Sequence, residues 1–181
     1  MPEGLRMEEI ILRPGSKELP EVQRLYEEAF PEDEQIPFDR LVNNRKECIL
    51  RAYSLEGELC ALSYVFEYGT IVYIGYLAVL KDLRGKQIGT QLLEHLKEQY
   101  RNYQIVGEIE LAEEGFDPTG IKRRRREFYL RHGFHSAGLC YRLFNTDYEI
   151  LTDKGVVTKE IWNRLAEAHV GAHIAKRIEY I

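Results

Sequence analysis

LKDLRGKQIGT, at Leu80–Thr90, joins an apolar run to an amphipathic one. The run before it, Ile71–Leu80, is almost continuously apolar, which is typical of a central strand. After Thr90, apolar side chains recur on one helical face, at Leu92, Leu93, Leu96 and Tyr100. The segment therefore predicts a strand, a glycine-containing turn and a helix.

A glycine-containing turn that opens a helix can bind phosphate or pyrophosphate. Its free backbone N–H groups point to one place, where the helix macrodipole also favours negative charge. Gly85 and Gly89 would let the backbone approach a ligand without an intervening Cβ. An ordinary strand-to-helix turn with two glycines is the alternative. The segment matches neither the Rossmann G-x-G-x-x-G pattern nor a P-loop.

Length and composition predict one compact domain over residues 1–181. The chain is 44% hydrophobic and 30% charged, which is ordinary for a soluble protein. Its longest apolar run is too short to cross a bilayer, and no signal-peptide pattern opens it. Three cysteines without a C-x-x-C pair indicate a reducing compartment, so we expect a cytoplasmic protein: Cys48, Cys60 and Cys140.

The charge pattern argues against nucleic acid and membrane as partners, because the net charge is −5. Residues 1–60 hold fourteen Asp and Glu against eight Lys and Arg. The basic run Lys122–Arg126 would spread around a helix rather than form one stripe, which favours a solvated helix over a nucleic-acid site.

Apolar periodicity and turn residues predict the remaining elements. Strands are expected at 7–13, 49–54, 59–68, 71–80, 104–112, 134–144 and 147–152. Helices are expected at 22–30, 38–44, after Thr90, at 120–132 and at 158–168. Gly133 is the stop signal of the helix at 120–132, and the last helix lies within a helical extension over about 157–181. This order predicts a single three-layer α/β (α+β) domain with a mixed sheet flanked by helices.

Two linked motifs give the chain a resemblance to a known family. They are Arg84-Gly85-Lys86-Gln87-Ile88-Gly89 and Tyr129-Leu130-Arg131-His132-Gly133-Phe134. Together they resemble the [QR]-x-x-G-x-[GA] and Tyr-x-x-x-Gly-Phe signatures of the GNAT superfamily of acetyl-CoA-dependent N-acetyltransferases, over about residues 7–152. Gln87 and Lys122 depart from it, since the family usually has Gly and often Asn there. Residues 29–38 are more loosely similar to a bacterial branch with AFP-x-x-E-x-x-PF.

The resemblance implies a fold and a cofactor. The fold would be of the acyl-CoA N-acyltransferase type, with a mostly antiparallel sheet of about seven strands. Its fourth and fifth strands would splay apart, and the pantetheine arm of acetyl-CoA would pair with the backbone of Leu77, Ala78 and Val79. The pyrophosphate would lie on Arg84, Gly85, Lys86, Gln87, Ile88, Gly89 and Thr90.

The resemblance also implies direct attack of an amine on the thioester, without an acyl-enzyme. Tyr129 would be the general acid, and its alternative role is ring packing at a helix end. Glu108 or Glu110, which alternate to one face of the fifth strand, would be the general base. Glu67 or a chain of water molecules are alternatives. The acceptor wall would be formed by Tyr26, Phe30 and Phe38, residues that are also typical of a core.

Other kinds of site are less favoured. His132 and His135 flank a helix stop, and His169 and His173 could share a helical face, but neither pair has a third ligand nearby, so we expect no metal. No cysteine has a recognisable histidine partner for a covalent mechanism. The expected partner is an amine-bearing small molecule or protein, and a homodimer stays open. A non-catalytic acyl-CoA sensor on the same fold is the alternative function.

Overall fold

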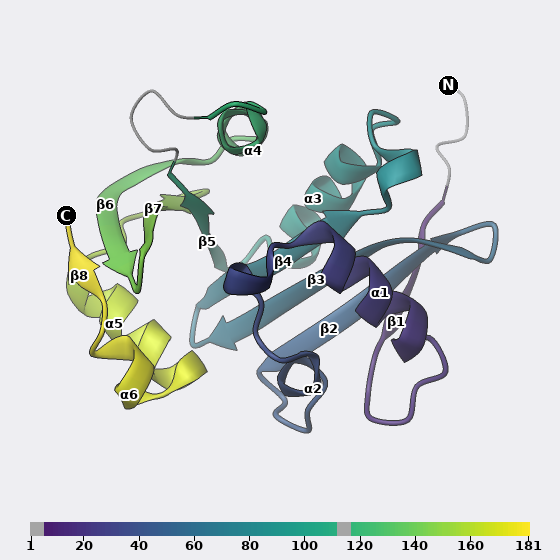
Figure 1. The fold of residues 1–181 in the computed structure, drawn as a ribbon, viewed down its shortest axis with the longest axis horizontal. Helices are drawn as coiled ribbons and strands as arrows, with labels where there is room; N and C mark the ends of the chain where they lie inside the picture. The colour runs from purple at the N-terminus through teal and green to yellow at the C-terminus, as the bar shows by residue number, and fades with distance from the viewer. Residues whose placement is uncertain (1–5, 112–116) are drawn as a thin grey trace. The chain divides into compact units, whose positions relative to one another are not determined.

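Figure 1 shows the computed structural model, which describes residues 6–111 and 117–181. The chain forms two compact units by its internal contacts. Unit 1 comprises Met1–Glu67 and Ile74–Leu96, and unit 2 comprises Tyr68–Tyr73 and Lys97–Ile181. Within the described residues, every helix is too short or too polar to cross a membrane.

Unit 1 carries the N-terminal strands and helices. They are β1 (Glu8–Ile11), α1 (Leu19–Ala29), the 3₁₀ helix η1 (Glu32–Glu34), α2 (Phe38–Leu41), β2 (Cys48–Leu55), β3 (Glu58–Tyr68), β4 (Ile71–Val79), the 3₁₀ helix η2 (Lys81–Leu83) and α3 (Ile88–Gln99). The first three residues of β4 and the last three of α3 belong to unit 2. The pairs β1–β2 and β2–β3 are antiparallel.

Helices α1 and α3 cover opposite faces of the strands in unit 1. Tyr53 of β2 faces α3, where its ring lies 6.1 Å from that of His95. Leu50 is three residues away and therefore points to the other face, because side chains alternate along a strand. Its cross-strand partner Tyr64 contacts Tyr76, which in turn contacts Tyr26 of α1. Unit 1 is thus layered as helix, sheet and helix.

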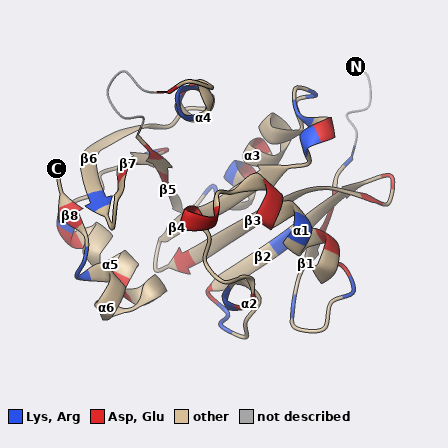
Figure 2. Ribbon diagram, in the orientation of Figure 1, with Lys and Arg blue, Asp and Glu red and all other residues tan. Residues whose placement is uncertain are grey.

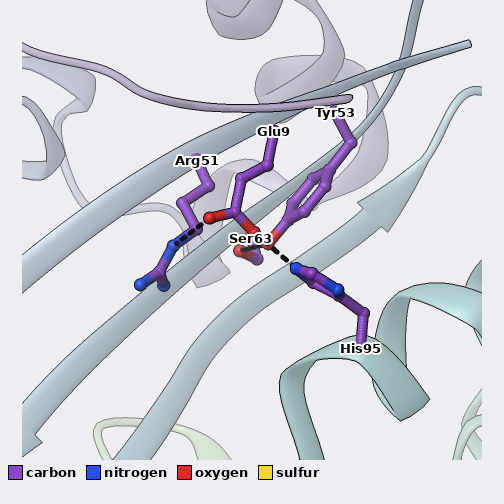
Figure 3. A network of polar contacts seen from close by, with 5 residues as sticks. All are labelled: Glu9, Arg51, Tyr53, Ser63 and His95. Carbon is purple, nitrogen blue, oxygen red and sulfur yellow. Dashed lines mark hydrogen bonds and ion pairs between the residues drawn. The ribbon is translucent and has the colours of Figure 1, made fainter. Parts of the chain in front are cut away.

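A polar network joins the edge strand β1 to its neighbours (Figure 3). The Glu9 carboxylate lies 3.4 Å from Nε of the buried Arg51 on β2 and 2.7 Å from Nε2 of His95 on α3. Beside it, the hydroxyl groups of Tyr53 and Ser63 lie 2.8 Å apart. A buried guanidinium is costly without a carboxylate partner, so Glu9 fixes β1 against β2 and α3.

Unit 2 carries the C-terminal elements. They are β5 (Gln104–Glu110), α4 (Ile121–Arg131), β6 (His135–Leu143), β7 (Thr146–Thr152), α5 (Lys159–Val170), α6 (Ala172–Ala175) and β8 (Glu179–Tyr180). The pairs β5–β7, β6–β7 and β6–β8 are antiparallel. Thr158 caps α5 by accepting a hydrogen bond from Ile161 N–H, and α4 ends before Gly133, whose φ is +86°.

The hydrogen-bonded strand order is β1-β2-β3-β4-β5-β7-β6-β8, which confirms the predicted fold class of a mixed, mostly antiparallel sheet with flanking helices. Most of the predicted elements are present within a few residues of the expected bounds. The end of the strand predicted at 104–112 lies outside the described residues. The single domain over residues 1–181 stays a prediction.

Two details of the C-terminal region differ from the sequence analysis. Within the described residues the sheet has eight strands, which is consistent with the expected number of about seven, and the last of them, β8, pairs with β6. The extension over 157–181 therefore contains a strand besides its helices. His169 and His173 do not share a helix, because α5 ends at Val170 and Gly171, with φ +90°, separates it from α6.

Candidate active site

The end of β4 and the start of α3 form one packed segment of unit 1. Leu77 and Val79 pack against a cluster that includes Ile88 and Leu92 of α3. The backbone N–H of Leu80 donates to Cys60 O at 2.9 Å, and η2 then leads into the turn. The apolar contacts of Ile88 anchor the first turn of α3, while Arg84–Gln87 before it are exposed.

The turn contains two residues in the left-handed region. Gly85 has φ +79° and Gln87 has φ +63°. Glycine adopts this conformation without steric cost, whereas a residue with a Cβ pays about 1–2 kcal/mol. Gln87, where the family signature has Gly, thus keeps the backbone conformation that a glycine favours.

The turn has the features of an anion cradle. Gln91 N–H donates to Gln87 O at 3.0 Å, which starts the hydrogen-bond ladder of α3. The N–H groups before Gln91 have no acceptor within the helix, as at any helix N-terminus. Arg84 lies along the strand end, with its Nε 3.3 Å from Val79 O, and Lys86 is exposed. Free N–H groups, the positive helix end and two cations favour a phosphate ligand.

Tyr129 lies in α4 of unit 2 and is partly buried. Its ring centroid lies 5.4 Å from that of Phe128 and 5.3 Å from that of Phe134, which follows the glycine stop. Burial raises the pKa of its hydroxyl, and the nearby charge of Arg125 opposes this shift. Among the described residues its hydroxyl has no hydrogen-bond acceptor. The group is therefore protonated at neutral pH and able to donate.

Glu108 is the more unusual of the two acidic residues on β5. Tyr73 of β4 donates a hydrogen bond to its Oε1 at 2.5 Å. Its Oε2 is sealed from solvent and has no hydrogen-bond partner among the described residues. Burial raises the pKa of Glu108 to about 7, although the Tyr73 hydrogen bond lowers it. A carboxyl that titrates near neutral pH suits general base catalysis.

Glu110 has a different environment. Its Oε1 forms an ion pair with Lys122 Nζ at 2.6 Å, and both side chains are partly exposed. This contact gives Lys122, one of the departures from the family pattern, a partner within unit 2. Arg126 of the same basic run pairs with Glu149 at 2.8 Å. Glu67 lies near the end of β3, in unit 1.

The residues expected in an acceptor wall form one aromatic cluster in unit 1. Tyr26 is buried, and its ring lies 5.7 Å from Phe30 and 5.8 Å from Phe38. Its hydroxyl both donates to Ile36 O and accepts from Ile36 N–H, each at 2.8 Å. Tyr26 thus anchors the loop between η1 and α2, while Phe30 and Phe38 remain partly exposed.

Two tyrosines of β4 contribute contacts that the sequence analysis missed. Tyr76 packs against Tyr26 at 4.9 Å and donates to Glu34 O at 2.7 Å. Tyr73 holds Glu108, which is 35 residues away. In the sequence, both tyrosines stand out only as polar-tipped side chains within an apolar strand. That pattern does not reveal which residues they contact.

The histidine and cysteine candidates have other surroundings. His132 Nδ1 lies 2.6 Å from Phe128 O, at the end of α4. Residues 6–111 and 117–181 contain no group of three or more His, Cys, Asp and Glu side chains that could hold a metal ion. Cys48 and Cys60 are buried and Cys140 is partly buried, all three as free thiols.

Comparison with known proteins places this geometry in a family. The model of the acetyltransferase (GNAT) domain matches residues 46–136, just over half of the chain. The candidate acetyltransferase YjbC of Bacillus subtilis (strain 168) is 33% identical over 76 residues. That match covers 42% of this chain and 38% of the length of YjbC.

Solved structures share the fold at low sequence identity. A candidate GNAT-family acetyltransferase from Bacteroides thetaiotaomicron superposes with a TM-score of 0.74 at 17% identity, covering 91% of this chain and 99% of that one. A GNAT-family acetyltransferase from Elizabethkingia anophelis with acetyl-CoA bound has a TM-score of 0.61 at 16% identity, covering 82% and 98%. With the matched domain and both signature motifs, this chain belongs to the GNAT acetyltransferase family.

Proposed function

We propose that this protein is an N-acetyltransferase that moves an acetyl group from acetyl-CoA to a primary amine by direct attack. The observation that carries the proposal is the turn at Arg84–Thr90. Two of its residues have a positive φ, and the free N–H groups of α3 follow them, in a chain of the GNAT family. The acetyl-CoA bound to the Elizabethkingia anophelis protein supports the choice of cofactor.

Unit 1 would bind the cofactor. The turn at Arg84–Thr90 would hold the pyrophosphate, with Arg84 and Lys86 adding charge. The backbone of Leu77–Val79 would pair with the pantetheine arm, and one N–H there would stabilise the oxyanion that forms on the thioester. Donors fixed where charge develops are usually the largest single contribution to catalysis.

Glu108 and Tyr129 would act as the base and the acid. The Glu108 carboxylate would take a proton from the acceptor's ammonium group, directly or across one water molecule. The neutral nitrogen then forms a bond to the thioester carbon and loses its second proton to solvent, and the C–S bond breaks as the tetrahedral intermediate collapses. Tyr129 gives its hydroxyl proton to the leaving thiolate. Exchange with solvent afterwards restores both groups.

The direct test of this function is thiol release from acetyl-CoA with a panel of amines. The panel contains small amines, aminoglycosides, amino acids and peptides with free N-termini or lysines, and mass spectrometry identifies any acetylated product. Amine-dependent thiol release is the expected result. Tight CoA binding without thiol release from any acceptor would instead favour an acyl-CoA sensor.

The cofactor site predicts unequal effects of two neighbouring substitutions. Gly89→Val places a branched side chain where the backbone N–H groups must approach phosphate. We expect CoA affinity in calorimetry to fall by at least about 100-fold, because charge-assisted hydrogen bonds of about 1.5–3 kcal/mol each are lost. The control Lys86→Ala removes one exposed charge and should cost less. Unchanged affinity of Gly89→Val, with a native circular dichroism spectrum, would mean that the phosphates bind elsewhere.

The acidic N-terminal region predicts a preference for cationic acceptors. Figure 2 shows η1, with Glu32, Asp33 and Glu34, as a continuous acidic segment after α1. Electrostatic steering should make kcat/KM for a cationic amine fall with added salt, by less than about tenfold, because the Debye length is about 8 Å at physiological salt. The double variant Glu32→Gln, Asp33→Asn should weaken that dependence. A kcat/KM that rises with salt, or a preference for acidic acceptors, would contradict the prediction.

A further inference from the structure

The hydrogen bond between Tyr73 and Glu108 is the main polar contact that the described structure gives the Glu108 carboxyl, on a partly buried side chain. Tyr73 is 7% exposed, and its hydroxyl donates to Glu108 Oε1. The other carboxyl oxygen, Oε2, is sealed from solvent and has no partner within residues 6–111 and 117–181. The orientation of the carboxyl in the described structure therefore depends on one hydroxyl group.

The ring of Tyr73 is itself held by α5. Its centroid lies 5.7 Å from that of Trp162 and 5.5 Å from that of His169, and both contacts are edge-on. Trp162 is 3% exposed and also contacts Tyr141 of β6 at 5.7 Å. Helix α5 lies beyond residues 46–136, so an element outside the matched family domain positions the tyrosine.

Two opposing effects set the protonation of Glu108. Burial disfavours the carboxylate and raises its pKa, and the hydrogen bond from Tyr73 favours the carboxylate and lowers it. Among the described residues, the ring of His169 faces Tyr73, and the Glu110–Lys122 ion pair lies two residues along β5. Tyr73 is therefore the group best placed to favour the ionised form of this carboxyl.

We propose that Tyr73 is a positioning residue, which orients the Glu108 carboxyl through its hydrogen bond, while the α5 rings of Trp162 and His169 hold Tyr73 in place. The proposal rests on the proposed function in one respect, the role of Glu108 as the base. The hydrogen bond and its effect on titration belong to unit 2 and can be measured without turnover.

The test is Tyr73→Phe, which keeps the ring and its packing and removes one hydroxyl. Carboxyl ¹³C NMR of glutamate-labelled protein reports the titration of Glu108, with Glu108→Gln identifying its signal. We expect the Glu108 midpoint to rise by about one pH unit, because one hydrogen bond to an ionised group is lost. The acid limb of the kcat profile should move equally, so that kcat falls about tenfold at pH 6 and stays within about twofold at pH 9.

A matched control is Tyr180→Phe, which also removes a hydrogen-bonded hydroxyl from unit 2. Tyr180 donates to Lys159 O at 3.1 Å and contacts Asn163 Oδ1 at 2.7 Å. This variant should leave the Glu108 midpoint unchanged. An unchanged midpoint in Tyr73→Phe, or a kcat that falls equally at every pH, overturns the proposal. A wild-type protein that releases no thiol with any amine overturns the proposed function instead, and the NMR titration still decides whether Tyr73 controls Glu108.

Discussion

Tyr129→Phe is expected to lower kcat by roughly 10²–10⁴-fold with the best acceptor, the range for loss of a general acid. This corresponds to about 3–5 kcal/mol of transition-state stabilisation. The substitution keeps the ring that packs on Phe128 and Phe134, and it deletes the O–H that would protonate the leaving thiolate. Affinity for acetyl-CoA in calorimetry should change little, since one neutral hydrogen bond contributes about 0.5–1.5 kcal/mol.

Two comparisons separate acid catalysis from packing. A thioester whose thiol has a lower pKa needs less protonation, so the loss caused by Tyr129→Phe should shrink with such a substrate. Tyr103→Phe removes the hydroxyl of another partly buried tyrosine of unit 2, whose ring packs on Tyr100 at 5.3 Å, and should leave kcat close to wild type. If Tyr129→Phe lowers kcat by less than about threefold and the melting temperature falls, Tyr129 is a packing residue.

The elements that local signals predicted are those with a long apolar pattern or a clear end signal. Helix α1 has a buried stripe at Val22, Leu25 and Tyr26, and α5 has the cap at Thr158. The two helices themselves were expected from the spacing of apolar residues, because a helix buries one face with a period of 3.6 residues. The turn at Arg84–Thr90 was likewise predicted as a contiguous segment, since its glycines and the helix after it are adjacent in sequence.

The elements that sequence analysis missed depend on partners far away in the chain. Strand β8 has two residues, Glu179 and Tyr180, and exists because Arg142 and Tyr141 of β6 pair with them. No periodicity can be read from two residues. The position of β7 between β5 and β6 is also a property of tertiary pairing, which strand patterns do not specify.

The choice of the general base also depends on contacts between residues that are distant in the sequence. Glu108 and Glu110 have the same residue type and were predicted to share a face of one strand, so the sequence could not choose between them. Their surroundings differ because Tyr73 and burial act on Glu108, whereas Lys122 pairs with Glu110. Both partners come from other elements of unit 2, and only the folded chain distinguishes the two carboxyls.

Glu108→Gln should lower kcat by roughly 10²–10⁴-fold at neutral pH, because the amide cannot take a proton from the acceptor. It should also remove the acid limb near pH 7 from the kcat profile. Gln Oε1 can still accept the hydrogen bond from Tyr73, so the local packing is retained. The comparison variant Glu110→Gln breaks the ion pair with Lys122 and should cost less than about tenfold. A larger loss in Glu110→Gln than in Glu108→Gln would assign the base to Glu110.

Stability measurements make the role of Glu108 testable without turnover. Its native pKa of about 7 lies above the ordinary glutamate value of 4.5, so the folded state favours the protonated form. Below about pH 4.5 the carboxyl is neutral in both states, and Gln should give a similar melting temperature. Between about pH 4.5 and pH 7 the unfolded state ionises before the folded state, so the wild type loses up to about 3 kcal/mol of stability, whereas Glu108→Gln does not. The variant should therefore be the more stable protein at pH 8. Equal melting temperatures at that pH would show that the Glu108 carboxylate is already solvated and that burial does not raise its pKa.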